Sequence, residues 1–199
     1  NNQIYLFWED VTGGDIEFTS SNLSFATVAD TVYTGTTAWS NPVCTTNNKS
    51  SDGIFCVAID ASNSDCSYAN ETGDSAGDGI LFSTDSFPID IDTASTACDI
   101  TVDTLGEPWA ASMDSANDDV DVINNGMATT RIAYEGAVIT TTAQDLGLNI
   151  EIMEINGSDL IYVAFSENNS IRLANSSVAN PIKWENKTLD RNTSTNPTM

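Results

Sequence analysis

The chain has 199 residues, with 6 Lys and Arg against 29 Asp and Glu, for a formal net charge of −23. So few basic residues exclude a nucleic-acid binder, which must replace phosphate counterions, and no apolar run is long enough to predict membrane insertion. The sequence contains no histidine, which excludes histidine general bases, histidine-ligated zinc and histidine triads.

Four short apolar runs dominate the sequence. Each is rich in β-branched or aromatic residues, which is typical of a buried strand. In chain order they lie at residues 4–8, 54–59, 120–123 and 160–165. A turn rich in Gly, Asn or Asp follows every run, and these residue types suit the tight connections of β-hairpins.

A shorter strand with an alternating apolar pair follows each turn, at an almost constant distance. The distances from run start to pair start are 12, 12, 12 and 11 residues. The pairs are Ile16/Phe18, Cys66/Tyr68, Ile132/Tyr134 and Ile171/Leu173. Further strands are predicted before three runs, at 42–44, 108–113 and 148–153, and after each pair, near 38–39, 80–82, 138–139 and 182–184. The repeated unit is therefore a four-stranded antiparallel meander.

Repetition of such units predicts an all-β fold, a single β-propeller domain of about four blades over residues 1–199. The expected blades are 196–199 with 1–40, then 41–106, 107–147 and 148–195. Because residues 196–199 resemble 41–44, we expect the last strand to close the ring inside the first blade. A fragment of a larger propeller and a β-sandwich are the alternatives.

Cysteines and glycosylation sequons predict an extracellular or cell-surface protein. The four cysteines form no Cys-x-x-Cys motif, which favours disulfides over a metal site. Hairpin geometry predicts a Cys44–Cys56 bond, which leaves Cys66 to pair with Cys98. Eight sequons predict a glycoprotein. They begin at Asn22, Asn48, Asn70, Asn156, Asn168, Asn175, Asn186 and Asn192.

Two segments resemble a known family. Residues 4–20, with IYLFWED and DIEFTSS, and residues 160–184, with IYVAFSENNSIRLANSS before Lys183 and Trp184, are similar to sialidase-like propellers built from bacterial neuraminidase repeats. The resemblance implies the propeller fold. The Asp-box of that family, Ser-x-Asp-x-Gly-x-x-Trp, is not intact in the sequence.

The resemblance also indicates which chemistry to look for. Sialidases of this fold bind the substrate carboxylate with three arginines. This chain has only Arg131, Arg172 and Arg191, and the first two fall in predicted third strands, away from the central channel. A carboxylate clamp needs convergent guanidinium groups. We therefore expect no enzymatic activity.

Two acidic turns are candidate calcium sites, because hard cations prefer several carboxylate and carbonyl oxygens. Ordinary turn chemistry is the alternative interpretation, since Asp and Asn are common in hairpin turns. Asp90 and Asp92 form a third acidic pair. No other cofactor is predicted. The candidate ligands are Asp60, Asn63 and Asp65 in one turn, and Asp114, Asn117 and Asp119 in the other.

These observations predict a non-catalytic, secreted or cell-surface propeller that serves as a structural, adhesion or assembly module. Its partners would be further copies of itself, as in an extracellular filament, or other surface proteins. A glycan-binding, lectin-like propeller is one alternative, and a diverged sialidase-like glycosidase is another. Tryptophans could stack on sugars, although each also suits a core position. They are Trp8, Trp39, Trp109 and Trp184.

Overall fold

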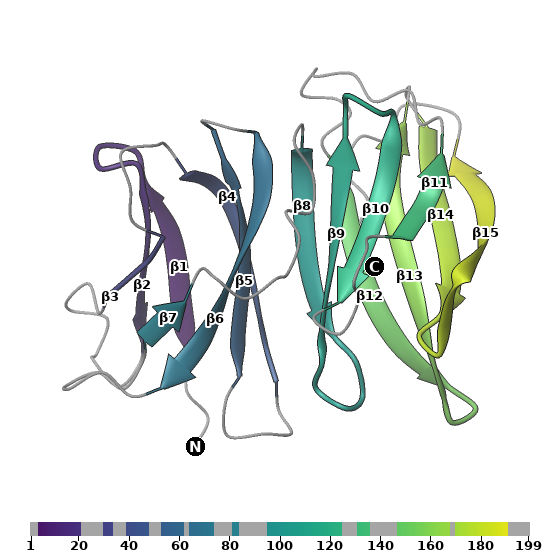
Figure 1. Ribbon diagram of the computed structural model, residues 1–199, viewed down its shortest axis with the longest axis horizontal. Helices are drawn as coiled ribbons and strands as arrows, with labels where there is room; N and C mark the ends of the chain where they lie inside the picture. The colour runs from purple at the N-terminus through teal and green to yellow at the C-terminus, as the bar shows by residue number, and fades with distance from the viewer. Residues whose placement is uncertain are drawn as a thin grey trace.

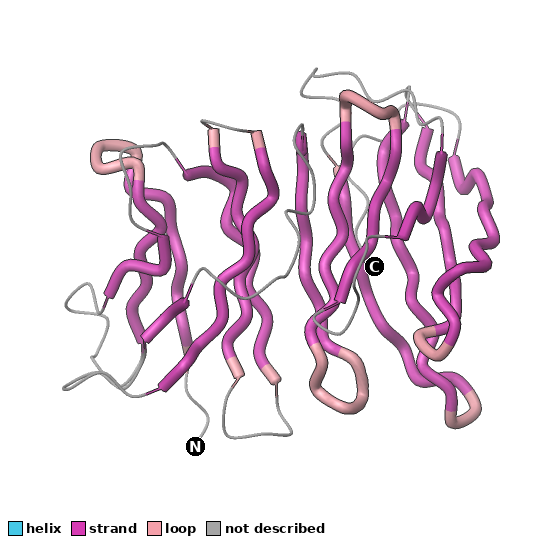
Figure 2. Tube along the Cα trace, viewed as in Figure 1, coloured by secondary structure: helices cyan, strands magenta, loops and turns pink. Residues whose placement is uncertain are grey.

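The computed structural model describes ten stretches of the chain. They are residues 4–20, 30–33, 39–47, 53–61, 64–73, 81–83, 95–124, 131–135, 147–167 and 170–190. Strands are the only regular structure in these stretches (Figure 2). Within them, no helix is long and apolar enough to cross a membrane. Four antiparallel sheets, A to D, stand side by side in chain order (Figure 1).

The described strands follow one another within each sheet, as in a meander. Sheet A contains β1 (Tyr5–Asp10), β2 (Asp15–Ser20) and β3 (Asp30–Tyr33). Sheet B contains β4 (Trp39–Thr46), β5 (Ile54–Asp60), β6 (Asp65–Gly73) and β7 (Leu81–Ser83). Sheet C contains β8 (Ser95–Val102), β9 (Pro108–Asp114), β10 (Asp119–Asn124) and β11 (Arg131–Glu135). Sheet D contains β12 (Leu148–Ile155), β13 (Ser158–Glu167), β14 (Ser170–Ser177) and β15 (Asn180–Asp190).

Equivalent strands of neighbouring sheets lie against one another. The first strands β4, β8 and β12 contact in sequence, and the last strands meet as β3 with β7 and β11 with β15. Sheets that repeat radially around their first strands are the arrangement of propeller blades. The predicted all-β, propeller-like fold is thus confirmed. We refer to β4, β8 and β12 as the inner strands.

Each sheet buries both faces where it stands between two others. In β5, Cys56 and Ala58 pack toward sheet A, whereas Val57 and Ile59 pack toward sheet C. Successive side chains of a strand point to opposite faces, so a strand covered on both sides is apolar throughout. This explains why the run at 54–59 does not alternate with polar residues.

The largest core lies between sheets C and D. Trp109 and Met113 of β9 meet Ile161 and Phe165 of β13, and all four side chains are almost fully buried. At its edge, Arg172 lies over the Tyr134 ring, with 5.4 Å from Cζ to the ring centroid. Its Nε donates to Glu167 Oε2 at 2.6 Å. Arg172 thus has a local structural role on β14.

The strand order in sheet C differs from the predicted one. Residues 108–113 were expected as the first strand and 120–123 as the second, but they lie in β9 and β10, the second and third strands. The first strand is β8, where the sequence repeat predicted no strand. Its residues 97–100 include Ala97, Cys98 and Ile100, which are buried against sheets B and D.

The ring closure expected in sheet A lies outside the described residues, since residues 196–199 do. Trp39, expected at the end of the first blade, opens β4 instead, and β3 is the third described strand of sheet A. The strand expected at 138–139 is also outside the described part of the chain. Sheets A and D stand at opposite ends of the molecule (Figure 1), an open arc consistent with the fragment alternative.

One hairpin recurs between successive strands. In sheets A, B and C, an Asp ends one strand and another Asp begins the next, with four turn residues between them. The last turn residue has a positive φ in all three: Gly14 at 75°, Ser64 at 60° and Asp118 at 58°. β1 therefore corresponds to the second strands β5 and β9. The sequence repeat predicted the match of residues 4–8 with β5, but it aligned them with residues 120–123, which lie in β10, instead of with β9.

Candidate functional site

The first predicted calcium turn joins β5 and β6. Asp60 and Asp65 face each other in the strand register, and both are largely buried, with 9% exposure. Asn63 lies outside the described residues. The Asp60 carbonyl accepts the Ser64 N–H at 2.7 Å, which closes the turn.

The second predicted turn joins β9 and β10, with Asp114 opposite Asp119. Asp114 is fully buried, and its Oδ1 accepts the Ala116 N–H at 2.6 Å. Its Oδ2 accepts the Asn117 amide N–H at 2.5 Å, so the amide nitrogen of Asn117 faces the carboxylate. Across the described stretches, no group of three or more acidic or cysteine side chains is arranged to hold a metal ion. Calcium binding stays a prediction.

The predicted Cys44–Cys56 disulfide is present and joins β4 to β5 within sheet B. The second predicted pair is not bonded: Cys66 and Cys98 are buried free thiols on neighbouring sheets. Burial, with a hydrogen bond and charge from Cys98, raises the pKa of the Cys66 thiol well above its ordinary value. These thiols belong to the core between sheets B and C.

The sequons and tryptophans fall in varied surroundings. Asn156 and Asn186 are exposed, whereas Asn70 and Asn175 are half-buried strand residues. The other four sequons, at Asn22, Asn48, Asn168 and Asn192, lie outside the described residues. Trp109 is a core residue, and Trp8, Trp39 and Trp184 are half-buried.

Two carboxylates that the sequence did not single out lie on adjacent inner strands. Asp99 of β8 is only 6% exposed. Its Oδ1 accepts the Ile100 N–H, and its Oδ2 accepts the Ile150 N–H and the Asn149 side-chain amide, each at 2.8 Å. Asp99 therefore connects sheet C to sheet D at the middle of the inner strands.

Glu151 of β12 is the second carboxylate. Its side chain is exposed, and partial burial followed by the nearby charge of Asp99 raises its pKa. Burial likewise raises the pKa of Asp99, partly offset by its three hydrogen bonds. A carboxylic acid that keeps its proton to higher pH is suited to general acid catalysis. Perturbed carboxyl groups of this kind are candidates for a functional site.

A small cavity lies near the start of the same inner strands. Its volume is about 210 Å³. Apolar and polar groups share its lining, which comprises Asn41, Val43, Thr96, Ala97, Cys98 and Leu148. Three of these residues precede Asp99 directly, and Leu148 is close in sequence to Glu151. The inner strands thus place a cavity and two carboxylates in one region.

Asp99 and Glu151 could be found from the sequence only once β8 is recognised. Without that strand, Asp99 is one of many acidic residues in its part of the sequence. In β8 it stands between Cys98 and Ile100, two buried residues, and an acid in such a strand needs partners.

Comparison with known proteins gives neighbours in structure only. No protein-family profile matches the chain, and no curated protein sequence matches it. An exo-β-1,3-galactanase from Clostridium thermocellum aligns over 96% of this chain and 46% of its own, at 13% identity and a TM-score of 0.54. An exo-β-1,3-galactanase from Phanerochaete chrysosporium, solved with β-1,3-galactotriose, aligns over 96% of this chain and 48% of its own. The identity is 13% and the TM-score is 0.55.

A β-1,3-galactosidase of family GH43 aligns over 94% of this chain and 43% of its own, at 11% identity and a TM-score of 0.53. At these identities the likeness establishes the propeller fold, and this chain spans less than half of each neighbour. The neighbours are two exo-β-1,3-galactanases and a β-1,3-galactosidase and not sialidases, so the sialidase resemblance holds only for the propeller fold.

The comparisons correct two expectations. A non-catalytic structural, adhesion or assembly module was expected, and no enzymatic activity. Both expectations are contradicted, because the structural neighbours are glycoside hydrolases. The three arginines bear only on the carboxylate clamp of sialidases. A neutral sugar has no carboxylate to bind.

Proposed function

We propose that this chain is a carbohydrate-active propeller that hydrolyses β-linked galactan or a related neutral glycan. The observation that carries the proposal is the placement of two carboxylates, Asp99 and Glu151, on adjacent inner strands, where the charge of Asp99 contributes to raising the pKa of Glu151. The fold shared with two exo-β-1,3-galactanases and a β-1,3-galactosidase supports the substrate class.

In the proposed reaction, Glu151 donates its proton to the glycosidic oxygen as the bond from that oxygen to the anomeric carbon breaks. Water adds its hydroxyl group to the anomeric carbon and releases a proton, which restores the acid. Asp99 is too buried and too fully hydrogen-bonded to reach a substrate. It is therefore a positioning residue, whose charge helps Glu151 to remain protonated.

An extracytoplasmic location accompanies this proposal. The Cys44–Cys56 disulfide supports it, because disulfides persist in oxidising compartments. The exposed sequons at Asn156 and Asn186 are compatible with glycan attachment.

The test compares substrates that differ in their need for a proton. Glu151→Gln should lower the release of galactose from β-1,3-galactan by about 100-fold or more, as expected for loss of a general acid. It should affect dinitrophenyl β-galactoside much less, because that leaving group departs without protonation. Glu185→Gln, an exposed acid on β15, is the matched control and should retain full activity.

Asp99→Asn gives an independent test of the positioning role. Removing the charge beside Glu151 lowers the pKa of Glu151, so the alkaline limb of the pH–rate profile should move to lower pH. Absence of turnover on every β-galactoside by the wild-type chain would overturn the proposal. Equal loss on both leaving groups in Glu151→Gln would overturn the acid role.

A further inference from the structure

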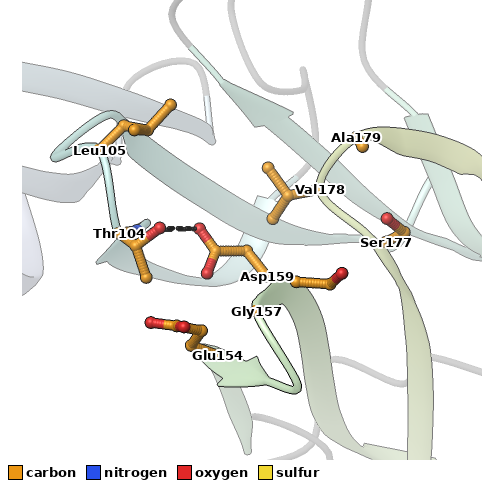
Figure 3. Close-up of a pocket in the computed structure, with 9 residues that line it drawn as sticks. Thr104, Leu105, Glu154, Gly157, Asp159, Ser177, Val178 and Ala179 are labelled. Carbon is orange, nitrogen blue, oxygen red and sulfur yellow. Dashed lines mark hydrogen bonds between the residues drawn. The ribbon is translucent and has the colours of Figure 1, made fainter.

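A larger cleft lies at the opposite end of the inner strands from the small cavity. It is formed by the turn after β8, the β12–β13 hairpin and the β14–β15 hairpin, and its volume is about 560 Å³. This is within the range of small-ligand sites, roughly 300–1,000 Å³. Figure 3 shows Thr104 and Asp159 facing each other inside it, with Glu154 beside them.

Asp159 holds the three walls of the cleft together. Its Oδ2 accepts the backbone N–H of Thr104 at 3.0 Å and the Thr104 hydroxyl at 2.5 Å. Its backbone carbonyl accepts the Val178 N–H at 3.0 Å. The Asp103 carboxylate in turn fixes the Leu105 N–H at 2.9 Å. The cleft is therefore organised before any ligand arrives, which lowers the entropic cost of binding.

One carboxylate oxygen of the cleft, Asp159 Oδ1, has no hydrogen-bond donor within the described part of the chain. Glu154 and Asp159 are direct cross-strand partners, and like charges in this relation repel. The Asp159 Oδ1 atom is also buried. A buried polar atom without a partner costs free energy, so a ligand that supplied donors here would be favoured.

The apolar lining distinguishes a sugar from a simple cation. Leu105 is 81% exposed at the rim, and Val178 and Ala179 continue the apolar surface. Ser158 and Ser177 add hydroxyl groups that donate and accept. A neutral sugar has hydroxyl groups for the carboxylates and an apolar C–H face for Leu105. A hydrated metal ion would leave the apolar wall unused.

We propose that this cleft is a second carbohydrate site, which binds one or two neutral sugar rings of a glycan without cleaving it. The ligand class rests on the proposed function, but the site is separate from Asp99 and Glu151. Its role would be to hold one part of a glycan at the β12–β13 and β14–β15 hairpins of sheet D, while Glu151 on the inner strand β12 acts on another part of the same glycan.

The experiment uses the full chain carrying Glu151→Gln, so that hydrolysis does not obscure binding. Calorimetric titration with β-1,3-galactobiose should give saturable binding. Adding Glu154→Gln or Leu105→Ala should weaken this binding at least tenfold. Adding Glu185→Gln, the exposed control, should leave it unchanged. Both cleft side chains are exposed, and circular dichroism checks that each variant keeps the fold.

Each outcome bears on one proposal separately. Binding that weakens in the cleft variants supports the cleft site, even if the wild-type chain cleaves nothing. Binding that ignores Glu154 and Leu105 overturns the cleft site, while Glu151-dependent hydrolysis would still support the proposed function. The cleft site is also overturned if the disaccharide does not bind. The same holds if magnesium or calcium chloride gives a heat of binding in the titration and the disaccharide gives none.

Discussion

The Asp99 carboxylate on β8 lies 2.8 Å from the side-chain nitrogen of Asn149 on β12, measured from Oδ2 to Nδ2. The same oxygen accepts the Ile150 N–H, so one buried acid joins two neighbouring blades through a side chain and a backbone group. A second polar link between these sheets is the Thr104–Asp159 contact. Sheets C and D are therefore held in register by hydrogen bonds as well as by their shared apolar core.

Asn149→Ala should destabilise the protein by about 2 kcal/mol, because it removes a hydrogen bond to a buried carboxylate. Urea unfolding followed by tryptophan fluorescence measures the change. Asn186→Ala, on the exposed side of β15, is the matched control and should change stability by less than about 0.5 kcal/mol. If the two variants behave alike, the blade-to-blade hydrogen bond is not a stabilising one.

Glu151 should make stability depend on pH. Its pKa is raised in the folded protein above the ordinary value of 4.5, so the folded state holds the proton more tightly than the unfolded state. The resulting stabilisation is fully present below pH 4.5 and is lost as pH rises through the folded pKa. Between pH 4 and pH 8, the unfolding free energy of the wild type should therefore fall relative to that of Glu151→Gln, which cannot lose this proton. A constant difference would contradict the raised pKa.

Reduction of the Cys44–Cys56 disulfide should lower stability by about 3 kcal/mol, the amount expected for a loop of this length. The measurement is the thermal midpoint with and without a phosphine reductant. Cys66→Ala is the control, since it removes a free thiol and should leave the response to reductant intact. If the thermal midpoint is unchanged although reduction of the disulfide is verified, the pairing of β4 with β5 stabilises this hairpin without the covalent bond.

The blade pattern was predictable where side chains obey a simple periodicity. Residues 54–59 and 160–165 are apolar on both faces, and each becomes the second strand of a blade. The Cys44–Cys56 bond followed from hairpin register, since both residues fall opposite each other. The predicted Cys66–Cys98 bond is absent, although the two thiols lie in the same core between sheets B and C and interact through a hydrogen bond.

The sites were less accessible to sequence reasoning. β8 carries Asp99 and Thr101 among apolar residues and lies beside an acidic stretch, so composition concealed it. Asp99 acquires its partners Asn149 and Ile150 from a strand about 50 residues away in the chain. Asp159 likewise meets Thr104 across two sheets. Long-range contacts of this kind depend on how the blades pack, and the sequence repeat predicts the blades but not their packing.

The recurrent hairpin turn allows a test with opposite signs at equivalent positions. Gly14 and Ser64 both precede the Asp that opens the next strand, with φ of 75° and 60°. A side chain in this left-handed region costs about 1 kcal/mol, which glycine avoids. Ser64→Gly should therefore stabilise the protein by about that amount, and Gly14→Ala should destabilise it similarly. The Ser64 backbone bonds to Asp60 and Ser95 are retained in the glycine variant.

The control is Ala61→Gly in the same turn as Ser64. The φ of Ala61 is not positive, so glycine there only increases the freedom of the unfolded chain and should destabilise the protein by about 0.5–1 kcal/mol. Thermal unfolding of Ser64→Gly, Gly14→Ala and Ala61→Gly shows directly whether each variant is more or less stable than the wild type. Stabilisation by Ser64→Gly together with destabilisation by Ala61→Gly would show that backbone conformation sets stability in this turn. If Ser64→Gly and Ala61→Gly lower the stability by equal amounts, loss of the side chain decides the outcome, and relief of the left-handed conformation does not.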